Sequence, residues 1–336
     1  MVEIEVLRPL LTKDMPRLIA LLALLLAASL AHAQAWKPSK NVEIVVGVSP
    51  GGGIDRMARL MQKVLQERRL IEVPANVVNK PGGGSTIAHA YLQQHAGDAH
   101  YVEIAATSLL TNHITGRSAI SHRDFTPIVM LSDEYIGFLV REDAPLKTGK
   151  DLLAALRASP ESLPVGIATA AGNTNHIAAA SATKIAGGDV KKLRVVVFGS
   201  GGEAMTALLG GHVALVATPA ANAIAHVQAG RMRVLAIAAP QRLEGALAAV
   251  PTWKEQGADV VVANWRPIVG PKGLTAPQVA YWESTFAKLT QSDEWRSEVA
   301  RDGSVSHYMN SRELGAYFEA QYAAFKVILT DLGLAR

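Results

Sequence analysis

A short β-branched run, a glycine loop and an amphipathic stretch follow one another near the start of the chain. Residues 41–48 are mostly apolar, and the loop Ser-Pro-Gly-Gly-Gly follows at 49–53. From Ile54 onward, apolar residues recur at i, i+3, i+4, i+7, i+10 and i+11, which predicts a strand followed by a helix with one buried face. Asp55 lies in the first helical turn, where the helix dipole favours a carboxylate, and it is placed to pair at i+4 with Arg59.

The same unit recurs along the chain. Residues 75–79, 165–168 and 194–198 are predicted strands, followed by glycine-containing loops at 80–86, 169–174 and 199–202. Helices are expected from near Ile87, Asn175 and Glu203, and the last of them ends at glycines 210–211. Further strands at 213–217 and 233–238 alternate with a helix around 221–229. This alternation predicts the α/β class, with parallel or mixed sheets covered by helices.

The positions of these junctions indicate two lobes. Residues 41–136 contain two glycine junctions and residues 137–262 contain two more. A Pro/Gly-rich stretch at 267–277 then precedes two amphipathic helices. We interpret residues 34–136 and 263–336 as lobe 1 and residues 137–262 as lobe 2, so that the C-terminal part returns to the first lobe.

The N-terminus has the parts of a secretory signal peptide. Residues 18–31 are apolar and uncharged, Arg17 precedes them, and Ala-His-Ala at 31–33 provides a small-x-small cleavage site. The run is shorter than the roughly 20 residues that span a bilayer, so we expect cleavage after Ala33 and not a retained anchor. Acidic residues before Met15 are unusual ahead of such a signal, which favours Met15 as the true start.

Composition excludes several classes of protein. The chain has no cysteine, so thiolate chemistry, disulfides and cysteine-ligated metals are excluded. Its net charge is +4, and removal of residues 1–33 takes away three basic and three acidic residues, leaving that value unchanged. The basic residues are scattered, which argues against a nucleic-acid partner.

Glycine loops that open helices are suited to anions. The first turn of a helix leaves N–H groups unpaired at the positive end of the dipole, and glycine lets a ligand approach the backbone. Each such end contributes about 0.3–1 kcal/mol to anion binding, and about 2 kcal/mol when partly buried. Convergence of three or four ends would give roughly millimolar to micromolar affinity. Only Lys80 is a cation within the loops, so the sequence favours N–H and hydroxyl donors over arginine clamps.

Two other patterns suggest different chemistry. Gly-Val-Ser-Pro-Gly at 47–51 matches a nucleophile elbow around Ser49, but Pro50 has no N–H to contribute to an oxyanion hole. A hydrolase or lyase using Ser49 or His176 is the enzymatic alternative. His89, His95 and His100 have spacings that fit no helical metal pair, and we interpret them as solvated surface residues.

Several motifs together resemble the Bug family, the extracytoplasmic receptors of tripartite tricarboxylate transporters. They are Ser-Pro-Gly-Gly-Gly-Ile-Asp at 49–55, Asn-Lys-Pro-Gly-Gly-Gly at 79–84, Gly-Ser-Gly-Gly at 199–202, Ala-Leu-Leu-Gly-Gly-His-Val at 207–213, Val-Pro-Thr-Trp at 250–253 and Trp265. The resemblance implies a periplasmic, monomeric protein with a two-lobed type II binding-protein fold and no cofactor, metal or catalytic residue. It would capture a small organic mono- or dicarboxylate and deliver it to membrane permease subunits. A receptor that feeds a signalling partner is the alternative.

The resemblance also implies the ligand-binding residues. The first two loops would hold the carboxylate through Pro50, Gly51, Gly52 and Gly53 and through Gly83, Gly84 and Ser85, and Asp55 would orient the first loop. The next strand-end loop would reach the cleft with Thr107 and Asn112. Two loops of the other lobe would close over the ligand with Thr174, Asn175, His176, Gly199, Ser200 and Gly201. The chain departs from the family at Ala214, usually Asp, and at Pro267, usually Gly after Trp265-Arg266, so the ligand class stays open.

Overall fold

The computed structural model describes residues 36–51, 53–301 and 303–336. The predicted signal peptide, the predicted start at Met15 and Gly52 lie outside the described residues. The strands are β1 (Val42–Val46), β2 (Ala75–Asn79), β3 (Tyr101–Ile104), β4 (Phe125–Arg141), β5 (Val165–Ala168), β6 (Val195–Phe198), β7 (Leu215–Pro219), β8 (Met232–Ile237), β9 (Ala263–Pro271) and β10 (Val305–Met309).

Helices alternate with most of these strands, and the helices that begin at residues 53, 86, 174 and 201 follow the four predicted glycine junctions. They are α2 (Gly53–Glu67), α3 (Thr86–Gln93), α4 (Ser108–Ile114), α5 (Gly149–Ala158), α6 (Thr174–Ala186), α7 (Gly201–Leu209), α8 (Ile224–Gln228), α9 (Ala276–Thr290), α10 (Asp293–Arg301) and α11 (Ser311–Asp331). Short 3-10 turns η1 (Gly83–Ser85) and η5 (Ala220–Ala223) precede α3 and α8. The predicted α/β alternation is therefore confirmed.

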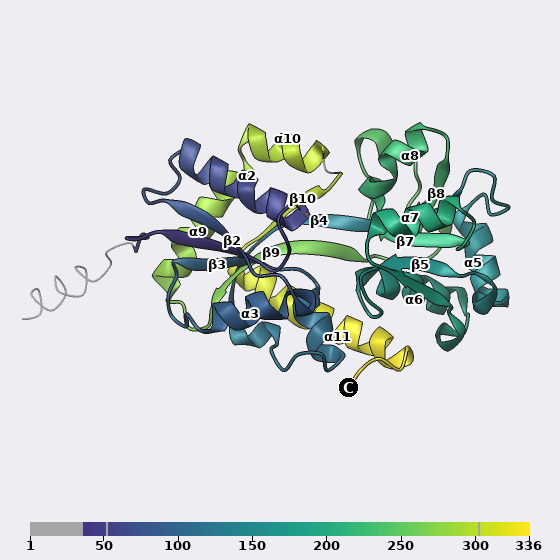
Figure 1. Ribbon diagram of the computed structural model, residues 1–336, viewed down its shortest axis with the longest axis horizontal. Coiled ribbons are helices and arrows are strands. Elements are labelled where there is room, and N and C mark those ends of the chain that lie inside the picture. The colour runs from purple at the N-terminus through teal and green to yellow at the C-terminus, as the bar shows by residue number, and fades with distance from the viewer. Residues whose placement is uncertain (1–35, 52, 302) are drawn as a thin grey trace, which may run out of the picture. The chain divides into compact units, whose positions relative to one another are not determined.

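The strands form two mixed sheets that share β4. In the first sheet β2, β1 and β3 are parallel, and β9 lies antiparallel between β3 and β4. In the second sheet β5 is parallel to β6 and β7, whereas β7 and β8 lie antiparallel to β4. Residues 125–135 of β4 pair with β9, and residues 136–141 pair with β7 and β8. Figure 1 shows β4 running from one sheet to the other.

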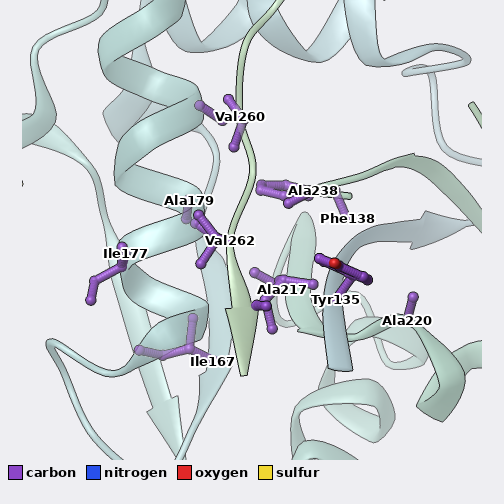
Figure 2. Close-up of a cluster of buried hydrophobic side chains, with 14 of the residues drawn as sticks. Tyr135, Phe138, Ile167, Ile177, Ala179, Ala217, Ala220, Ala238, Val260 and Val262 are labelled. Carbon is purple, nitrogen blue, oxygen red and sulfur yellow. The ribbon is translucent and has the colours of Figure 1, made fainter. Parts of the chain in front are cut away.

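The second sheet is held against its helices by a core of small and branched side chains. Figure 2 shows Phe138 of β4 with Ile167 of β5, Ile177 of α6 and Val262. Phe138 also meets the buried Trp253 edge to face, with ring centroids 4.9 Å apart. Burying one such side chain contributes about 1.5–3 kcal/mol, so this cluster stabilises the packing of α6 against the second sheet.

The same hydrophobic core extends to the first sheet, where it is built partly by the end of the chain. Helix α11 packs on β4, and its Phe318 lies 5.4 Å from the buried Trp265 of β9 between ring centroids. The far end of α11 reaches α6, where Lys184 and Asp331 form an ion pair of 2.5 Å. The C-terminal residues therefore contact elements of both sheets.

Two sequence predictions need correction. The C-terminal region contains α9, α10, β10 and α11 instead of two helices, and the Pro/Gly-rich stretch begins inside β9. Pro267 is accommodated in this buried strand because the β4–β9 register shifts between Met130 and Ser132, and such irregularities release ladder hydrogen bonds.

The clustered histidines are not surface residues. His89 and His100 are buried, and the His95 ring stacks on Tyr101 at 3.6 Å between centroids. His89 lies on the face of α3 that packs inward, with its Nε2 3.3 Å from Glu103 of β3. The prediction that these histidines are solvated was wrong for His89, which lies on the buried face of the short helix α3 together with Leu92. The spacing between the histidines does not show which of them lie on a buried helix face.

Candidate functional site

The starts of several helices open into one cavity of about 830 Å³. Its lining includes the first residues of α2, η1, α4, α6 and α7, and residues of η5. These segments follow β1, β2, β3, β5, β6 and β7, so strand ends of both sheets contribute. Ligands of open α/β sheets bind at such carboxyl edges, and the volume lies within the range of small-molecule sites.

The first two loops of the cavity touch each other. Gly47, directly after β1, lies so close to Ser85 that a Cβ at position 47 would be 2.3 Å from the Ser85 Cβ. The Ser85 hydroxyl donates to the Gly47 carbonyl at 3.4 Å. Glycine is therefore required at position 47 by the close approach of the second loop.

The second loop has an unusual backbone. Residues 82–85 all have positive φ, from 57° at Gly83 to 127° at Gly82, and Ser85 at 76° is one of the few non-glycine residues with this conformation. Asn112 of α4 fixes the turn by donating from Nδ2 to the Gly84 carbonyl at 2.8 Å. Thr169, in the loop after β5, is also left-handed at 67° and also lines the cavity. Such strain is concentrated at functional sites.

Asp55 secures the first loop. Its buried carboxylate accepts from the Gly51 N–H at 2.8 Å, from Asn79 Nδ2 at 2.8 Å and from Arg59 Nε at 2.9 Å. The hydrogen bond from Arg59 is the main reason that the pKa of Asp55 falls to about 2. The predicted Asp55–Arg59 pair is confirmed, and Asp55 itself does not line the cavity.

A chain of hydrogen bonds crosses the base of the cavity. Thr174, at the start of α6, and Thr107, before α4, are joined by their hydroxyls at 2.6 Å. Thr107 donates to Asn264 Oδ1 at 3.2 Å, and Asn264 Nδ2 donates to Glu134 Oε2 at 3.0 Å. Arg266 Nη2 donates to the same Glu134 oxygen at 2.7 Å. The chain therefore connects loops of both sheets to the β4–β9 ribbon.

The loops after β5 and β6 use several polar groups for their own structure. Asn173 caps α6 by accepting from the His176 N–H, and His176 Nδ1 accepts from the Gly172 N–H, both at 3.0 Å. Burial lowers the pKa of His176 to about 4, so the ring is neutral near pH 7. Ser200 caps α7 by accepting from the Glu203 N–H at 3.2 Å.

The predicted binding residues fall into two groups. Those that line the cavity are Gly53, Gly83, Gly84, Ser85, Thr107, Asn112, Thr174, Asn175 and Gly201. Those among the described residues that do not line it are Pro50, Gly51, Asp55, His176, Gly199 and Ser200. Gly52 lies outside the described residues.

Charged residues at the cavity are a feature that the sequence argument missed. Arg56, Arg117, Arg266 and Arg301 line the cavity, and among the described lining residues Glu134 is the sole carboxylate. All four arginines lie outside the glycine loops, because Arg56 is in α2, Arg117 follows α4, and Arg266 and Arg301 are in β9 and α10, so loop composition could not reveal them. The unusual Arg266-Pro267 after Trp265 was the available signal.

A cavity bordered by strand ends of two mixed sheets, with one long strand shared between them, is typical of the two-lobed fold of periplasmic binding proteins. The comparisons agree. Residues 57–334 match the family described as Tripartite tricarboxylate transporter family receptor, TctC. The chain belongs to this family, and the resemblance to Bug-family receptors of tripartite tricarboxylate transporters is confirmed. Proteins of this family are periplasmic solute-binding receptors.

Individual relatives cover nearly the whole chain. The "UPF0065 protein in gbd 5'region" of Cupriavidus necator is 28% identical over 94% of this chain and 94% of its own length. A TctC solute-binding protein from Polaromonas is 28% identical, with a TM-score of 0.76 over 88% of this chain and 99% of its own. An R. palustris protein solved with adipate is 23% identical, with a TM-score of 0.74 over 89% and 99% of the two chains. No helix in the described part of this chain has the length and apolarity to span a membrane.

Proposed function

We propose that this protein captures a small organic carboxylate in the cavity and delivers it to the membrane permease subunits of a tripartite tricarboxylate transporter. The observation that carries the proposal is the opening of four glycine junctions into one cavity. The junctions contribute Gly53, Gly83 to Ser85, Thr174 with Asn175, and Gly201. Each brings the positive end of a helix toward the same space, which favours an anion.

The charges around the cavity support an anionic ligand. Four arginines and one glutamate line it, so the lining is positive overall. Arg56 and Arg117 are exposed and can attract an anion over a distance set by the ionic strength, whereas the exposed Arg301 pairs with Glu298. The R. palustris protein of similar fold was solved with adipate, which supports a ligand that carries a carboxylate at its end. The attraction from the arginines adds to the binding free energy of roughly 0.3–1 kcal/mol that each helix end contributes for an anion.

Binding is proposed to close the two lobes around the ligand. We assign residues 34–136 and 263–336 to lobe 1 and residues 137–262 to lobe 2. The change of pairing partners along β4 between Tyr135 and Ile136 supports this boundary, because β9 begins beside it at Ala263. These adjacent strands would serve as the hinge, and the closed form would be what the permease recognises.

Export and the absence of catalysis complete the proposal. The signal peptide at residues 1–33 would direct the chain to the periplasm and be removed. A serine hydrolase is not favoured, because Ser49 is exposed and does not line the cavity, and Pro50 follows it. The described side chains include no hydrogen-bond partner of the Ser49 hydroxyl, whereas an activated serine needs an adjacent base.

A thermal-shift screen of residues 34–336 tests the proposal. The panel comprises succinate, malate, aspartate, citrate, glutarate, glutamate, adipate and nicotinate, applied to protein stripped of co-purified ligand. A ligand that binds only the folded state raises the melting temperature by mass action, so we expect a saturable shift with one structural class. No shift with any carboxylate would contradict the proposal.

A pair of glycine variants ties any shift to the second loop. A Cβ at Gly84 would lie 3.2 Å from Asn112 Nδ2, at a φ of 64°, so Gly84→Val displaces the side chain that fixes the loop. Gly97→Val is the control, because Gly97 also has positive φ, at 78°, but has no neighbour within 4 Å and lies outside the cavity. Both variants carry similar backbone strain. We expect only Gly84→Val to lose the ligand-dependent shift, and equal shifts in the two variants would contradict the assignment.

A further inference from the structure

The β4–β9 ribbon presents a polar face at the base of the cavity. Glu134 pairs directly with Asn264 and Ser132 with Arg266, and successive residues of a strand alternate between faces. Glu134, Asn264 and Arg266 line the cavity, whereas the intervening Trp265 packs on Tyr317 and Phe318 of α11. We call Glu134, Asn264 and Arg266 the strand floor.

The strand floor has one donor and one acceptor left over. Arg266 is 5% exposed, and its Nε–H has no hydrogen-bond partner among the described residues. Both hydrogen bonds to Glu134 reach Oε2, from Asn264 Nδ2 and Arg266 Nη2. No described residue donates to Oε1, and the Glu134 side chain is 20% exposed. The buried Nε–H is costly to leave without a partner, and the partly exposed Glu134 lines the cavity, which makes both atoms candidates to contact a ligand group.

The charges decide which ligand group fits. Arg266 and Glu134 neutralise each other at 2.7 Å, so together they offer no net attraction to a second carboxylate. A bare carboxylate beside Glu134 would meet a like charge in a partly desolvated place. A hydroxyl or ammonium group instead donates to Glu134 Oε1, and a neighbouring oxygen of the ligand accepts from Arg266 Nε. Hydrogen bonds to a charged partner are the stronger kind.

We infer that the strand floor selects carboxylates that also carry a hydrogen-bond donor, such as amino or hydroxy acids, over plain dicarboxylates of equal length. This inference rests on the proposed function, in which the glycine loops hold one carboxylate. Glu134 is then the specificity-determining residue, and Arg266 and Asn264 hold its carboxylate in place.

The test is isothermal titration of residues 34–336 with ligands matched in length. The sets are succinate with malate and aspartate, glutarate with 2-hydroxyglutarate and glutamate, and adipate with 2-aminoadipate. For the length that binds best, we expect a donor-bearing ligand to bind at least about tenfold more tightly than its plain counterpart, as a charge-assisted hydrogen bond provides. Equal or weaker binding of the donor-bearing ligands overturns the inference without any variant.

Two variants assign the selectivity to Glu134. Glu134→Gln keeps an acceptor for Arg266 and removes the negative charge, so we expect the preference for donor-bearing ligands to fall at least about fivefold and plain dicarboxylates to bind more tightly. Glu142→Gln is the control, since Glu142 follows β4, pairs with Arg233 at 2.8 Å and lies outside the cavity. We expect its preference to match that of the wild type.

The possible failures are distinguishable. If carboxylates bind but the preference is the same in Glu134→Gln, the strand floor does not select the ligand and the proposed function stands. If none of the matched ligands binds the wild-type protein, the inference is overturned, and the proposed function is contradicted as well only when citrate and nicotinate of the thermal-shift panel also give no shift.

Discussion

Asp55 offers a quantitative test of how the first loop is held. Asparagine at this position has nearly the same size and keeps one side-chain oxygen, but it loses the charge. The Nδ2 of asparagine is a donor and would replace an oxygen that now accepts hydrogen bonds. The two carboxylate oxygens accept from the Gly51 N–H, from Asn79 Nδ2 and from two nitrogens of Arg59. We therefore expect Asp55→Asn to destabilise the protein and to loosen the loop that precedes α2.

The pKa of Asp55 sets the expected magnitude. Its ordinary value of 3.8 falls to about 2 in the folded protein, chiefly through the hydrogen bond from Arg59. This difference corresponds to about 2 kcal/mol of extra stabilisation of the charged form. Because the folded-state pKa is the lower one, the contribution is complete above about pH 4 and is lost as the pH falls through about 2.

Urea unfolding at several pH values measures this contribution. At pH 7 the free energy of unfolding of Asp55→Asn should be about 2 kcal/mol below that of the wild type, and the gap should narrow below pH 4. Asp143→Asn is the control, because Asp143 also pairs with an arginine, Arg141, but on the exposed surface. Such surface pairs contribute little, so we expect a much smaller change. A gap that is absent at pH 7, or that does not change with pH, would refute the reasoning.

Two further predictions concern buried polar groups of the cavity region. Burial lowers the pKa of His176 to about 4, so its contribution to stability is complete above its ordinary pKa of 6.5 and is lost as the pH falls toward 4. In this window His176→Gln should reduce the slope of the unfolding free energy against pH by up to about 1.4 kcal/mol per pH unit, and an unchanged slope would contradict the prediction. Thr107→Val keeps the shape but leaves Thr174 and Asn264 without their partner, so urea unfolding should show a loss of about 1–3 kcal/mol, whereas wild-type stability would mean that the hydroxyl chain is not formed.

The sequence predicted the local units well and the long-range pairing poorly. Each glycine junction was readable because a β-branched run, glycines and an apolar period of 3.6 follow one another over a few residues. The strand β4 was not predicted, because its two apolar runs at 128–131 and 135–140 lack the alternation of a half-exposed strand and are separated by Ser-Asp-Glu at 132–134. Likewise, residues 267–277 were interpreted as a Pro/Gly-rich stretch and not as part of a strand, and only the register shift next to Met130 explains how β9 tolerates Pro267.

The candidate site shows the same limit. Backbone donors at helix starts follow from loop composition, so Gly84 and Thr174 could be proposed directly. Side chains that already serve as caps could not be separated from ligand contacts, which is why Ser200 was a predicted binding residue although it caps α7. Arg266 and Glu134 come from strands paired far apart in the sequence, and only the fold brings them together.

The most direct test of the central claim is a crystal structure of residues 34–336 with the carboxylate that gives the largest thermal shift. The account predicts a closed cavity in which a carboxylate of the ligand accepts hydrogen bonds from backbone N–H groups of the loop at Gly83, Gly84 and Ser85. A ligand whose carboxylates lie away from every glycine junction, or that binds outside the cavity, would contradict the account.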